Sequence, residues 1–452
     1  MQTNLSHSDL QVDITNRQIL KIALPISLAM LVPQINFITN NVFLGQLGET
    51  ELGSAGITGV FYLVFALVGN GLNSGLQGLI SRRAGENRPE EIGKLFGQAV
   101  RLALIMAFTC IVLTLVLSPV FFRASLHSGI VQDEAISFMR IRIWGLPFLY
   151  LFQMGNAFLV GTLNSRYMKY AFAVEAGINI FLDYVLISGH WGFPKLGFNG
   201  AAVASVTAEV IAVLIVYSII IYKKFHLRFN LFSNFRYQAK LTGLIFRQSA
   251  PLVMQWILSV GAWMLFYILI ENMGERPLAI SNTMRNVFGF FGIFTWAFAS
   301  TTNTMVSNVI GQDRKELVFG MIHKIMWLSF WFTCMLCLLV NLFPDLIFSI
   351  YSQQSSFTRE GIPVIRIVSV GLLFMSLSTV WLNAVTGTGN TKVNLLIEIA
   401  AIVVYCLYVW LVIRVWKLGL VWAWGSEIIY WITLLGFSYY YLRGGKWKAK
   451  RI

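Results

Sequence analysis

The fold of this chain is decided by a duplicated stretch, which first reads PISLAMLVPQINFITNNVFLGQLGETELG at residues 25–53. The same frame returns 226 positions later, at residues 251–279, as PLVMQWILSVGAWMLFYILIENMGERPLA, and 226 is half of the 452 residues. Each copy opens on a proline and has a Gly-Glu pair at the same place. This period is much longer than the roughly 20 to 50 residues of solenoid repeats, so the sequence predicts two lobes that are copies of one unit.

The match continues beyond this stretch without a change of offset. The matched pairs are Ser81 with Ser307, Gly85 with Gly311, Arg88 with Arg314, Arg140 with Arg366, Gly145 with Gly371, Gly161 with Gly387 and Asn164 with Asn390. Near the end of each half the offset falls to 222, where the motif Lys-Leu-Gly at 195–197 meets the same motif at 417–419. Chance does not explain agreement at one offset over so long a stretch. In membranes, an internal duplication of this kind is typical of transporters.

The composition indicates that both lobes lie in a bilayer. Apolar residues make up 57% of the chain and charged residues 12%, and the mean hydropathy is +0.68, which excludes a water-soluble fold. A helix needs about 20 apolar residues to cross about 30 Å of hydrocarbon. We therefore predict an all-α integral membrane protein with twelve transmembrane helices in two pseudo-symmetric six-helix lobes. The expected spans lie near 18–43, 53–81, 95–118, 135–162, 168–188, 199–222, 244–270, 278–309, 320–343, 362–386, 393–414 and 420–442.

Polar segments divide the chain into five parts. The expected parts are a cytoplasmic N-terminal segment at 1–17, an N-lobe at 18–223, a cytoplasmic inter-lobe loop at 224–247, a C-lobe at 248–442 and a basic cytoplasmic tail at 443–452. The first residues are polar and include Asp9 and Asp13, unlike the basic start of a secretory signal, so we expect no cleavage.

Basic residues predict the orientation, because Lys and Arg in short loops stay on the cytoplasmic side. Alternate connections are rich in these residues, as at 82–94, 223–247 and 443–451. Both termini should therefore be cytoplasmic, in a multi-pass protein of the plasma (inner) membrane. The same loops explain the net charge of +14. Nucleic-acid binding is disfavoured because the charge flanks spans and does not gather on one folded face.

The chain lacks the patterns of covalent chemistry. Its five histidines are far apart at span ends or in loops, and Cys334 and Cys337 lie within an apolar span, where packing is the simpler interpretation. No phosphate-binding G-x-x-x-x-G-K-[ST] loop occurs, which disfavours an ATP-driven pump. The glycines at 69, 71, 75 and 78 indicate close helix packing or a bend. We expect no enzyme and no cofactor.

Polar groups inside the spans are more informative, because an ionisable side chain in hydrocarbon costs roughly 3 kcal/mol or more. Asp183 lies in the middle of a span, four residues after Asn179. Four residues make about one helical turn, so the amide and the carboxylate share a face and could hold a proton or a cation together. A structural aspartate bonded to a neighbouring helix is an equally open interpretation.

Several motifs resemble the multidrug and toxic compound extrusion (MATE) transporters. The matching residues are Pro25; Gly45, Leu47 and Gly48; Arg83 and Gly85; Gly311 and Gln312; Gly387, Gly389, Asn390, Thr391 and Lys392; and, between Asn179 and Ser205, Asp183, Gly192, Pro194, Leu196, Gly197, Gly200, Ala201, Ala202 and Ala204. The resemblance covers nearly the whole chain. It implies two six-helix lobes around a central cavity, alternating access, and export of amphipathic, often cationic compounds driven by inward flow of protons or sodium ions.

The resemblance also implies a cation site in the N-lobe, with Asn179, Asp183, a hydroxyl best matched by Ser205, and an acid in the first span. That acid aligns with Asn40, which Asn41 follows, so this chain has one carboxylate in place of two. Glu209, one turn beyond Ser205, is a candidate for the missing charge. The remaining oxygen ligands suit sodium, while a lone aspartate also serves protons. We expect no metal beyond Na⁺ at Asp183, and the coupling ion stays open.

The C-lobe departs further from the family. The acids that some branches have in the seventh and tenth helices fall near Ser259 and Met375 here. Its apolar spans contain Glu398 and, close to a span start, Glu427, while Arg285 lies within the eighth span. An ion pair between Arg285 and one glutamate would offset much of the cost of burial, and its role could be structural or coupling.

Substrate contacts are expected on the cavity walls. Aromatic rings offer apolar surface and cation–π contacts, and polar side chains at that depth should face water. The expected lining residues are Gln34, Asn36, Asn73, Gln77, Gln255, Trp256, Trp263, Tyr267 and Trp296. Lipid contact or packing is the competing interpretation of each single aromatic residue.

The sequence thus favours a secondary antiporter that exports drugs or metabolites. The alternative is a flippase for lipid-linked oligosaccharides or an exporter of other polar metabolites, but such a cavity would need many basic residues and only Arg285 lies deep in a span. A membrane scaffold would give no reason for Asp183 beside Asn179. The expected partners are a small-molecule substrate and the lipid bilayer, without nucleic acid, and we expect a monomer.

Overall fold

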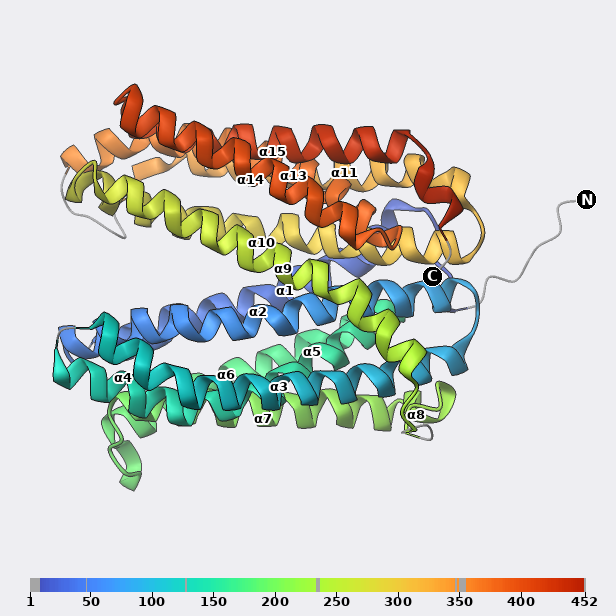
Figure 1. The fold of residues 1–452 in the computed structure, drawn as a ribbon, viewed down its shortest axis with the longest axis horizontal. Coiled ribbons are helices and arrows are strands. Elements are labelled where there is room, and N and C mark those ends of the chain that lie inside the picture. Colours follow the sequence, from blue (N-terminus) through green and yellow to red (C-terminus); the bar gives the residue numbers. More distant parts are fainter. Residues whose placement is uncertain are drawn as a thin grey trace, which may run out of the picture. The chain divides into compact units, whose positions relative to one another are not determined.

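The computed structural model of the chain describes residues 9–45, 47–126, 128–232, 236–345, 348 and 355–450, and these form helices joined by short turns. The helices gather into two compact units (Figure 1). The N-terminal unit is Leu24–Val253, and the C-terminal unit is Met254–Ile452 together with Met1–Ala23. The predicted all-α class is confirmed for the described residues.

The N-terminal unit is built around α5. The helices are α1 (Asn16–Gly45), α2 (Glu49–Gly85), α3 (Pro89–Ser125), α4 (Gly129–Arg142), α5 (Leu146–Gly161), α6 (Met168–Ser188), α7 (Phe198–Tyr222) and α8 (Phe225–Arg228). Short 3₁₀ turns lie at Ile143–Gly145, Ser165–Tyr167 and His190–Gly192. Helix α5 packs against α2, α3 and α7, and α6 covers α7. The fourth expected span is therefore α4 and α5 joined by a 3₁₀ turn.

The C-terminal unit repeats this plan around α13. Its helices are α9 (Ala239–Glu271), α10 (Glu275–Gly311), α11 (Val318–Leu342), α13 (Ser355–Gly387), α14 (Thr391–Trp410) and α15 (Leu420–Arg443). Helix α14 ends in a π-helical turn at Leu411–Val415, and 3₁₀ turns lie at Lys315–Leu317 and Lys446–Ala449. Helix α13 packs against α10, α11 and α15, and α14 covers α15. The two copies of the sequence repeat therefore share the same arrangement of packed helices.

Individual hydrogen bonds repeat as well. The Ser81 hydroxyl donates to the Gly161 carbonyl at 3.0 Å, and 226 residues on, the Ser307 hydroxyl donates to the Gly387 carbonyl at 2.8 Å. All four residues are buried. Because hydrocarbon offers no hydrogen-bond partner, polar groups at helix contacts must be satisfied inside the protein. The same serine hydrogen bond therefore satisfies the corresponding buried glycine carbonyl in each unit.

Eleven helical segments of the described chain are long and apolar enough to span a bilayer. They coincide with eleven of the twelve expected spans. The remaining expected span, near 278–309, corresponds to α10, a helix of 37 residues that is more polar. On α3, large apolar side chains stay exposed at every fourth residue, namely Phe108, Val112, Val116 and Val120. Such a stripe is suited to lipid contact.

The division into units differs from the predicted lobes near both boundaries. The boundaries fall within helices, at Ala23–Leu24 in α1 and at Val253–Met254 in α9, and the segment 224–247 belongs to the N-terminal unit. The first boundary lies directly before the pair Leu24–Pro25, and the second lies two residues after Pro251, the proline that corresponds to Pro25 in the repeat. The start of α9 packs closely on Gly71 and Gly75 of α2, where a larger side chain would meet its backbone, so the glycine run serves close helix packing.

The N-terminal segment is partly integrated into the C-terminal unit. The Asn308 side chain accepts a hydrogen bond from the Val12 backbone at 3.0 Å and donates to the Leu10 carbonyl at 2.8 Å. Leu10 and Val12 are buried. The predicted segment 1–17 is therefore not a separate part of the chain over its described residues.

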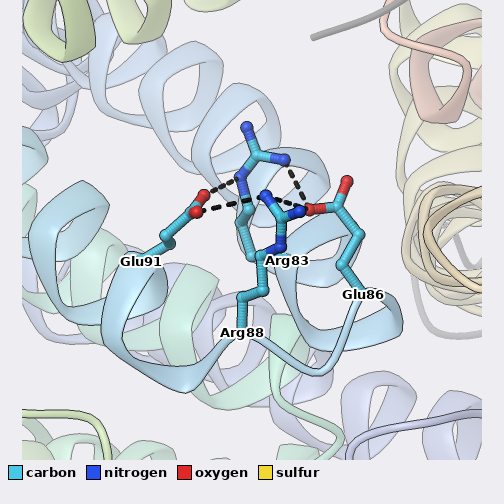
Figure 2. A network of polar contacts seen from close by, with 4 residues as sticks. All are labelled: Arg83, Glu86, Arg88 and Glu91. Carbon is cyan, nitrogen blue, oxygen red and sulfur yellow. Dashed lines mark hydrogen bonds and ion pairs between the residues drawn. The ribbon is translucent and has the colours of Figure 1, made fainter.

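The turn between α2 and α3 is held by four charged side chains (Figure 2). Arg83 contacts Glu86 at 2.6 Å and Glu91 at 2.8 Å, while Arg88 contacts Glu91 at 3.2 Å and Glu86 at 3.7 Å. Arg88 and Glu91 are exposed, so solvent weakens their attraction. The network orients a short connection, and part of the basic charge expected on this face is neutralised locally.

Candidate functional site

The sequence-predicted polar residues meet in the N-terminal unit around Asp183. Asn179 and Asp183 lie one turn apart on α6, and both are buried. Asn40 comes from α1; with its amide oriented so that the nitrogen faces the surrounding acceptors, its two hydrogens are shared among the Asp183 carboxylate, Asn179 Oδ1 at 3.0 Å and the Asn36 carbonyl at 3.1 Å. The carboxylate is thus met by an amide donor from another helix, and two segments 140 residues apart form one site.

Helix α7 completes this cluster through Ser205. The Asn179 amide donates to the Ser205 hydroxyl across a long contact of 3.4 Å. The two helices approach closely because α7 presents small residues toward α6: Gly200 lies against the Leu186 backbone, and the buried residues Ala204 and Ala208 follow at intervals of four. We call Asn40, Asn179, Asp183 and Ser205 the Asp183 cluster. The side chain of Asn41 lies outside the described part of the structure.

The Asp183 cluster has unused hydrogen-bonding capacity. Asp183 is 0% exposed, and its Oδ1 has no hydrogen-bond partner among the described residues. The Asn36 side-chain oxygen is also buried and unpaired within the described chain. Burying a carboxylate oxygen without a partner is costly, so this geometry suits a group that binds a proton or a small cation.

Glu209 does not join this cluster, contrary to the expectation that it could supply the missing charge. Its carboxylate accepts two hydrogen bonds from the Arg142 guanidinium of α4, at 2.6 and 2.9 Å. A buried glutamate beside a buried arginine forms this ion pair because the unpaired charges would be costly. Glu175 lies on the same face of α6 as Asn179, with a buried carboxylate oxygen. The sequence pattern did not reveal this second group of charges.

In the C-terminal unit, Glu398 of α14 is the centre of another polar cluster and is 1% exposed. It accepts hydrogen bonds from Ser259 at 2.6 Å, from Gln255 at 3.2 Å and from Tyr430. Asn394, one turn earlier, donates to the Gln255 side-chain oxygen. We call Gln255, Ser259, Asn394, Glu398 and Tyr430 the Glu398 cluster. The sequence had marked Ser259 only as a place where an acid is missing.

The Ser259 hydroxyl distinguishes two states of the Glu398 cluster. It has one hydrogen but lies 2.6 Å from Glu398 Oε1 and 2.9 Å from the Gln255 carbonyl. If Ser259 donates to Glu398, the carboxylate is ionised; if it donates to the Gln255 carbonyl, the hydrogen between Ser259 and Glu398 must come from a protonated carboxyl. The geometry therefore accommodates Glu398 with or without a proton.

The predicted ion pair between Arg285 and a glutamate is not present in the described residues. Arg285 is exposed and lies over the Tyr267 ring at 5.4 Å. Glu427 accepts instead from Trp431 at 3.1 Å and from Tyr405 at 3.5 Å. Uncharged donors therefore stabilise this buried carboxylate.

The expected substrate-lining residues occur in both units. Gln34, Asn36, Asn73 and Gln77 are in the N-terminal unit, and Gln255, Trp256, Trp263, Tyr267 and Trp296 are in the C-terminal unit. Gln255 belongs to the Glu398 cluster. Trp263 packs on Tyr267 and Phe288, with ring centroids 6.0 and 5.8 Å apart, and the Tyr267 hydroxyl donates to the Ser281 carbonyl at 3.0 Å. These two aromatics thus have packing roles within their own unit.

Two copies of one helical unit, with buried ionisable groups inside apolar spans, define a polytopic membrane protein of the secondary-transporter class. The MatE family model matches the chain twice, at residues 25–185 and 251–411, one match to each copy of the repeat. The chain belongs to the MatE family, a family of transporters and not of enzymes.

Curated relatives match over most of their length. The chain is 24% identical over 452 residues to "Probable multidrug resistance protein NorM" of Thermotoga maritima, covering 98% of this chain and 95% of the relative. It is 22% identical to a protein of the same description from Synechocystis, covering 84% of each chain. These similarities extend across both repeats.

Solved structures share the fold. "Crystal structure of MATE in complex with MaL6" matches with a TM-score of 0.90 at 19% identity, covering 98% of this chain and 99% of that one. "Outward-facing conformation of a multidrug resistance MATE family transporter of the MOP superfamily" also has a TM-score of 0.90, at 18% identity and 98% coverage of each chain. The predicted MATE-like helical fold is therefore confirmed.

Proposed function

We propose that this chain is a secondary antiporter that exports amphipathic, often cationic compounds in exchange for protons or sodium ions by alternating access. The observation that supports it most directly is the Asp183 cluster, a buried carboxylate with amide and hydroxyl neighbours in the middle of apolar helices. The names of the curated relatives, which refer to multidrug resistance, support the class of exported compound.

In this proposal Asp183 is the coupling group of the N-terminal unit. An ionised carboxylate in hydrocarbon is costly, and binding a cation neutralises it. The empty and the cation-bound carboxylate therefore differ in the cost of burying them. This difference lets the bound cation favour one conformation of the transporter over another. Asn40 stabilises the carboxylate while it is empty, and Asn179 and Ser205 offer further oxygens to a cation. These oxygens suit both a proton and sodium, so the experiment below compares the two gradients.

Glu398 is our second candidate for coupling. Its carboxylate has no basic partner among the described residues, and the single Ser259 hydrogen allows two bonding states. Glu427, which is held by Trp431 and Tyr405, is a further candidate in the same unit. Arg285 is retained only as a surface residue that lies over Tyr267.

Substrate contact is assigned to polar side chains of α1 and α2 and to aromatic side chains of α9 and α10. Asn36 and Asn73 support this assignment, since each has a buried side-chain oxygen without a partner in the described chain. Trp256 and Trp296, both half-buried, offer ring faces to a lipophilic cation. We also propose that both termini are cytoplasmic and that the transporter works as a monomer in the plasma membrane.

The test is efflux of ethidium, a lipophilic cation, from proteoliposomes under an imposed pH gradient or an imposed sodium gradient. We expect one gradient to drive efflux by the native chain, and that gradient identifies the coupling ion. In Asp183→Asn the amide keeps the shape but takes up no proton and offers no charge to a sodium ion, so gradient-driven efflux should fall at least about tenfold. Glu398→Gln measures the second candidate in the same assay.

The matched control is Asp133→Asn, which removes an exposed carboxylate from α4 of the same unit. It should leave efflux unchanged. Native-like efflux by Asp183→Asn would refute the role of Asp183. Absence of gradient-driven efflux in the native chain would refute the antiporter itself.

A further inference from the structure

A second group of charged side chains lies in the N-terminal unit, apart from the Asp183 cluster. Arg142 at the end of α4 binds Glu209 of α7 through its two terminal guanidinium nitrogens, Nη2 at 2.6 Å and Nη1 at 2.9 Å. The Tyr62 ring of α2 lies against the same guanidinium, 3.9 Å from its carbon. Side-chain exposure is only 13% for Arg142 and 8% for Glu209, so this is a buried ion pair.

The backbone next to this ion pair leaves space for its two side chains. The 3₁₀ turn Ile143–Gly145 separates α4 from α5, and a Cβ atom on Gly145 would collide with the Glu209 carboxylate and with the Arg142 guanidinium. A glycine at this position therefore leaves the space that the two charged groups occupy. The same Gly145 is one of the residues shared by both sequence repeats.

Glu175 adds a second carboxylate to the pair. It lies on α6, interacts electrostatically with both Arg142 and Glu209, and its Oε2 is buried without a hydrogen-bond partner among the described residues. The charged groups that face it are therefore one guanidinium and one carboxylate, from α4 and α7. With both glutamates ionised, the three side chains would hold one uncompensated negative charge in a largely buried site, which is costly.

We propose that Glu175 is a second proton-binding group of the N-terminal unit, whose occupancy is controlled by the Arg142–Glu209 pair. This inference rests on the proposed function. One proton on Glu175 neutralises the group and gives its unpaired oxygen a hydrogen to donate. A metal cation is disfavoured there because the guanidinium repels it and because hard cations require several oxygen ligands.

The position of Glu175 relates it to the coupling site. Glu175, Asn179 and Asp183 follow one another at intervals of four residues on α6, about 6 Å per step along one face. Ser205 and Glu209 have the same spacing on α7. The Asn179–Ser205 hydrogen bond joins this row of residues to the row on α6. Polar side chains of α6 and α7 thus lie between the Asp183 cluster and the Arg142–Glu209 pair inside one unit.

The experiment is pH-difference infrared spectroscopy of the purified transporter, which detects protonated buried carboxyl groups. We expect the native chain to show signals from Asp183 and Glu175 in addition to any from the buried acids Glu398 and Glu427 of the C-terminal unit. Asp183→Asn should lose the Asp183 signal and keep that of Glu175. Glu175→Gln should lose the Glu175 signal and keep that of Asp183. Glu209→Gln should also abolish the Glu175 signal, because the unpaired Arg142 then keeps Glu175 ionised although Glu175 itself is intact.

Efflux measurements separate this role from a structural one. Glu175→Gln imitates the protonated carboxyl, so it should still transport, but the contribution of Glu175 should be missing from the pH dependence of ethidium efflux. The control is Glu90→Gln, which removes an exposed carboxylate at the start of α3 and should match the native chain. A Glu175→Gln variant with the native infrared signals and the native pH profile would overturn the proposal.

The outcomes distinguish this inference from the proposed function. If the native chain and Glu175→Gln behave alike while Asp183→Asn is inactive, only the second proton site fails. If the native chain shows no gradient-driven efflux, the antiporter fails whatever the spectra show. Size-exclusion profiles and thermal unfolding of each variant identify one that has simply lost its fold, and the isosteric Glu175→Gln is chosen to avoid that.

Discussion

Two buried acids of the N-terminal unit differ in how their charge is balanced. Glu209 is neutralised by the guanidinium of Arg142, whereas the donor that the structure shows at Asp183 is the uncharged amide of Asn40. An amide stabilises an ionised carboxylate without neutralising it. Asp183 can therefore still gain by binding a positive charge, while Glu209 already has its partner. This difference, and not burial alone, is our reason for proposing Asp183 as the coupling group.

The first prediction concerns Asn40, which stands where the family resemblance implies a second acid. In Asn40→Asp the amide donor beside Asp183 becomes a carboxylate, and two carboxylates in contact must share a proton or a cation. We expect the coupling cation to half-saturate efflux at a concentration lower by about tenfold or more, since an added unit charge close by contributes on the order of 1–4 kcal/mol. The measurement is efflux against cation concentration.

Asn40→Ala is the comparison, because it removes the donor without adding charge. It should raise the half-saturating concentration or leave it unchanged. If Asn40→Asp and Asn40→Ala changed it equally, charge at this position would have no part in coupling.

At the scale of the helices, the Asp183 cluster depends on how closely α6 and α7 approach. Gly200 of α7 lies against the backbone of Leu186 in α6, and a hydrogen bond from the Leu196 backbone to the Leu186 carbonyl, 2.8 Å long, ties the connecting loop to the same turn. A backbone contact cannot be relieved by a rotamer change. The distance between Asn179 and Ser205 is therefore set by the absence of a side chain at Gly200.

This leads to a prediction for a matched pair of glycines. In Gly200→Ala the new methyl group would meet the Leu186 backbone within 3.0 Å, so we expect a loss of about 1–3 kcal/mol in unfolding free energy and weaker cation coupling. Gly177 on α6 has no atom within 4 Å of the corresponding position, so Gly177→Ala should be neutral or stabilise by about 0.5–1 kcal/mol.

Thermal unfolding in detergent, together with efflux, measures both variants. Equal stability of Gly200→Ala and Gly177→Ala would mean that α6 and α7 do not need this close contact.

At the scale of the whole molecule, the duplication has kept the packing while the polar sites have diverged. Glu427 stands 222 positions after Ser205 and Tyr405 stands 226 after Asn179, so the Tyr405–Glu427 contact replaces the Asn179–Ser205 contact. At the same offsets, the positions of Glu398 and Tyr430 are filled by Phe172 and Ala208 in the first copy. The Glu398 cluster is therefore particular to the C-terminal unit.

The conserved packing is tested by paired serine variants. Ser81→Ala and Ser307→Ala each leave a buried glycine carbonyl without this partner, at a cost of about 1–2 kcal/mol. Because the two bonds lie in different units and share no partner, the double variant should cost the sum within about 0.5 kcal/mol. Thermal unfolding of the three variants measures this additivity.

Thr109→Ala is the control, since that exposed hydroxyl bonds only to its own helix at Ile105. A cost for the serine variants no greater than for Thr109→Ala would show that these bonds do not support the units.

Hydrophobic length and internal repetition predicted most of the fold, since both are local properties of the chain. Each expected span corresponds to a helix, and Asn179 and Asp183 share a face because helical geometry alone requires it. The one-turn spacing of Ser205 and Glu209 wrongly suggested that Glu209 belongs to the Asp183 cluster. Local spacing could not reveal Arg142, which lies 67 residues away in the chain and binds Glu209.

The sequence by itself determined that this protein is a duplicated, helical membrane transporter, because hydropathy, charge bias and the repeat depend only on residue order. Tertiary structure alone decided which polar groups meet. It brought Asn40 to Asp183, Arg142 to Glu209 and Ser259 to Glu398, and it left Arg285 at the surface. The physical reason is that a buried charge takes whichever partner helix packing brings within hydrogen-bond distance, and the packing of distant segments is not encoded in local spacing.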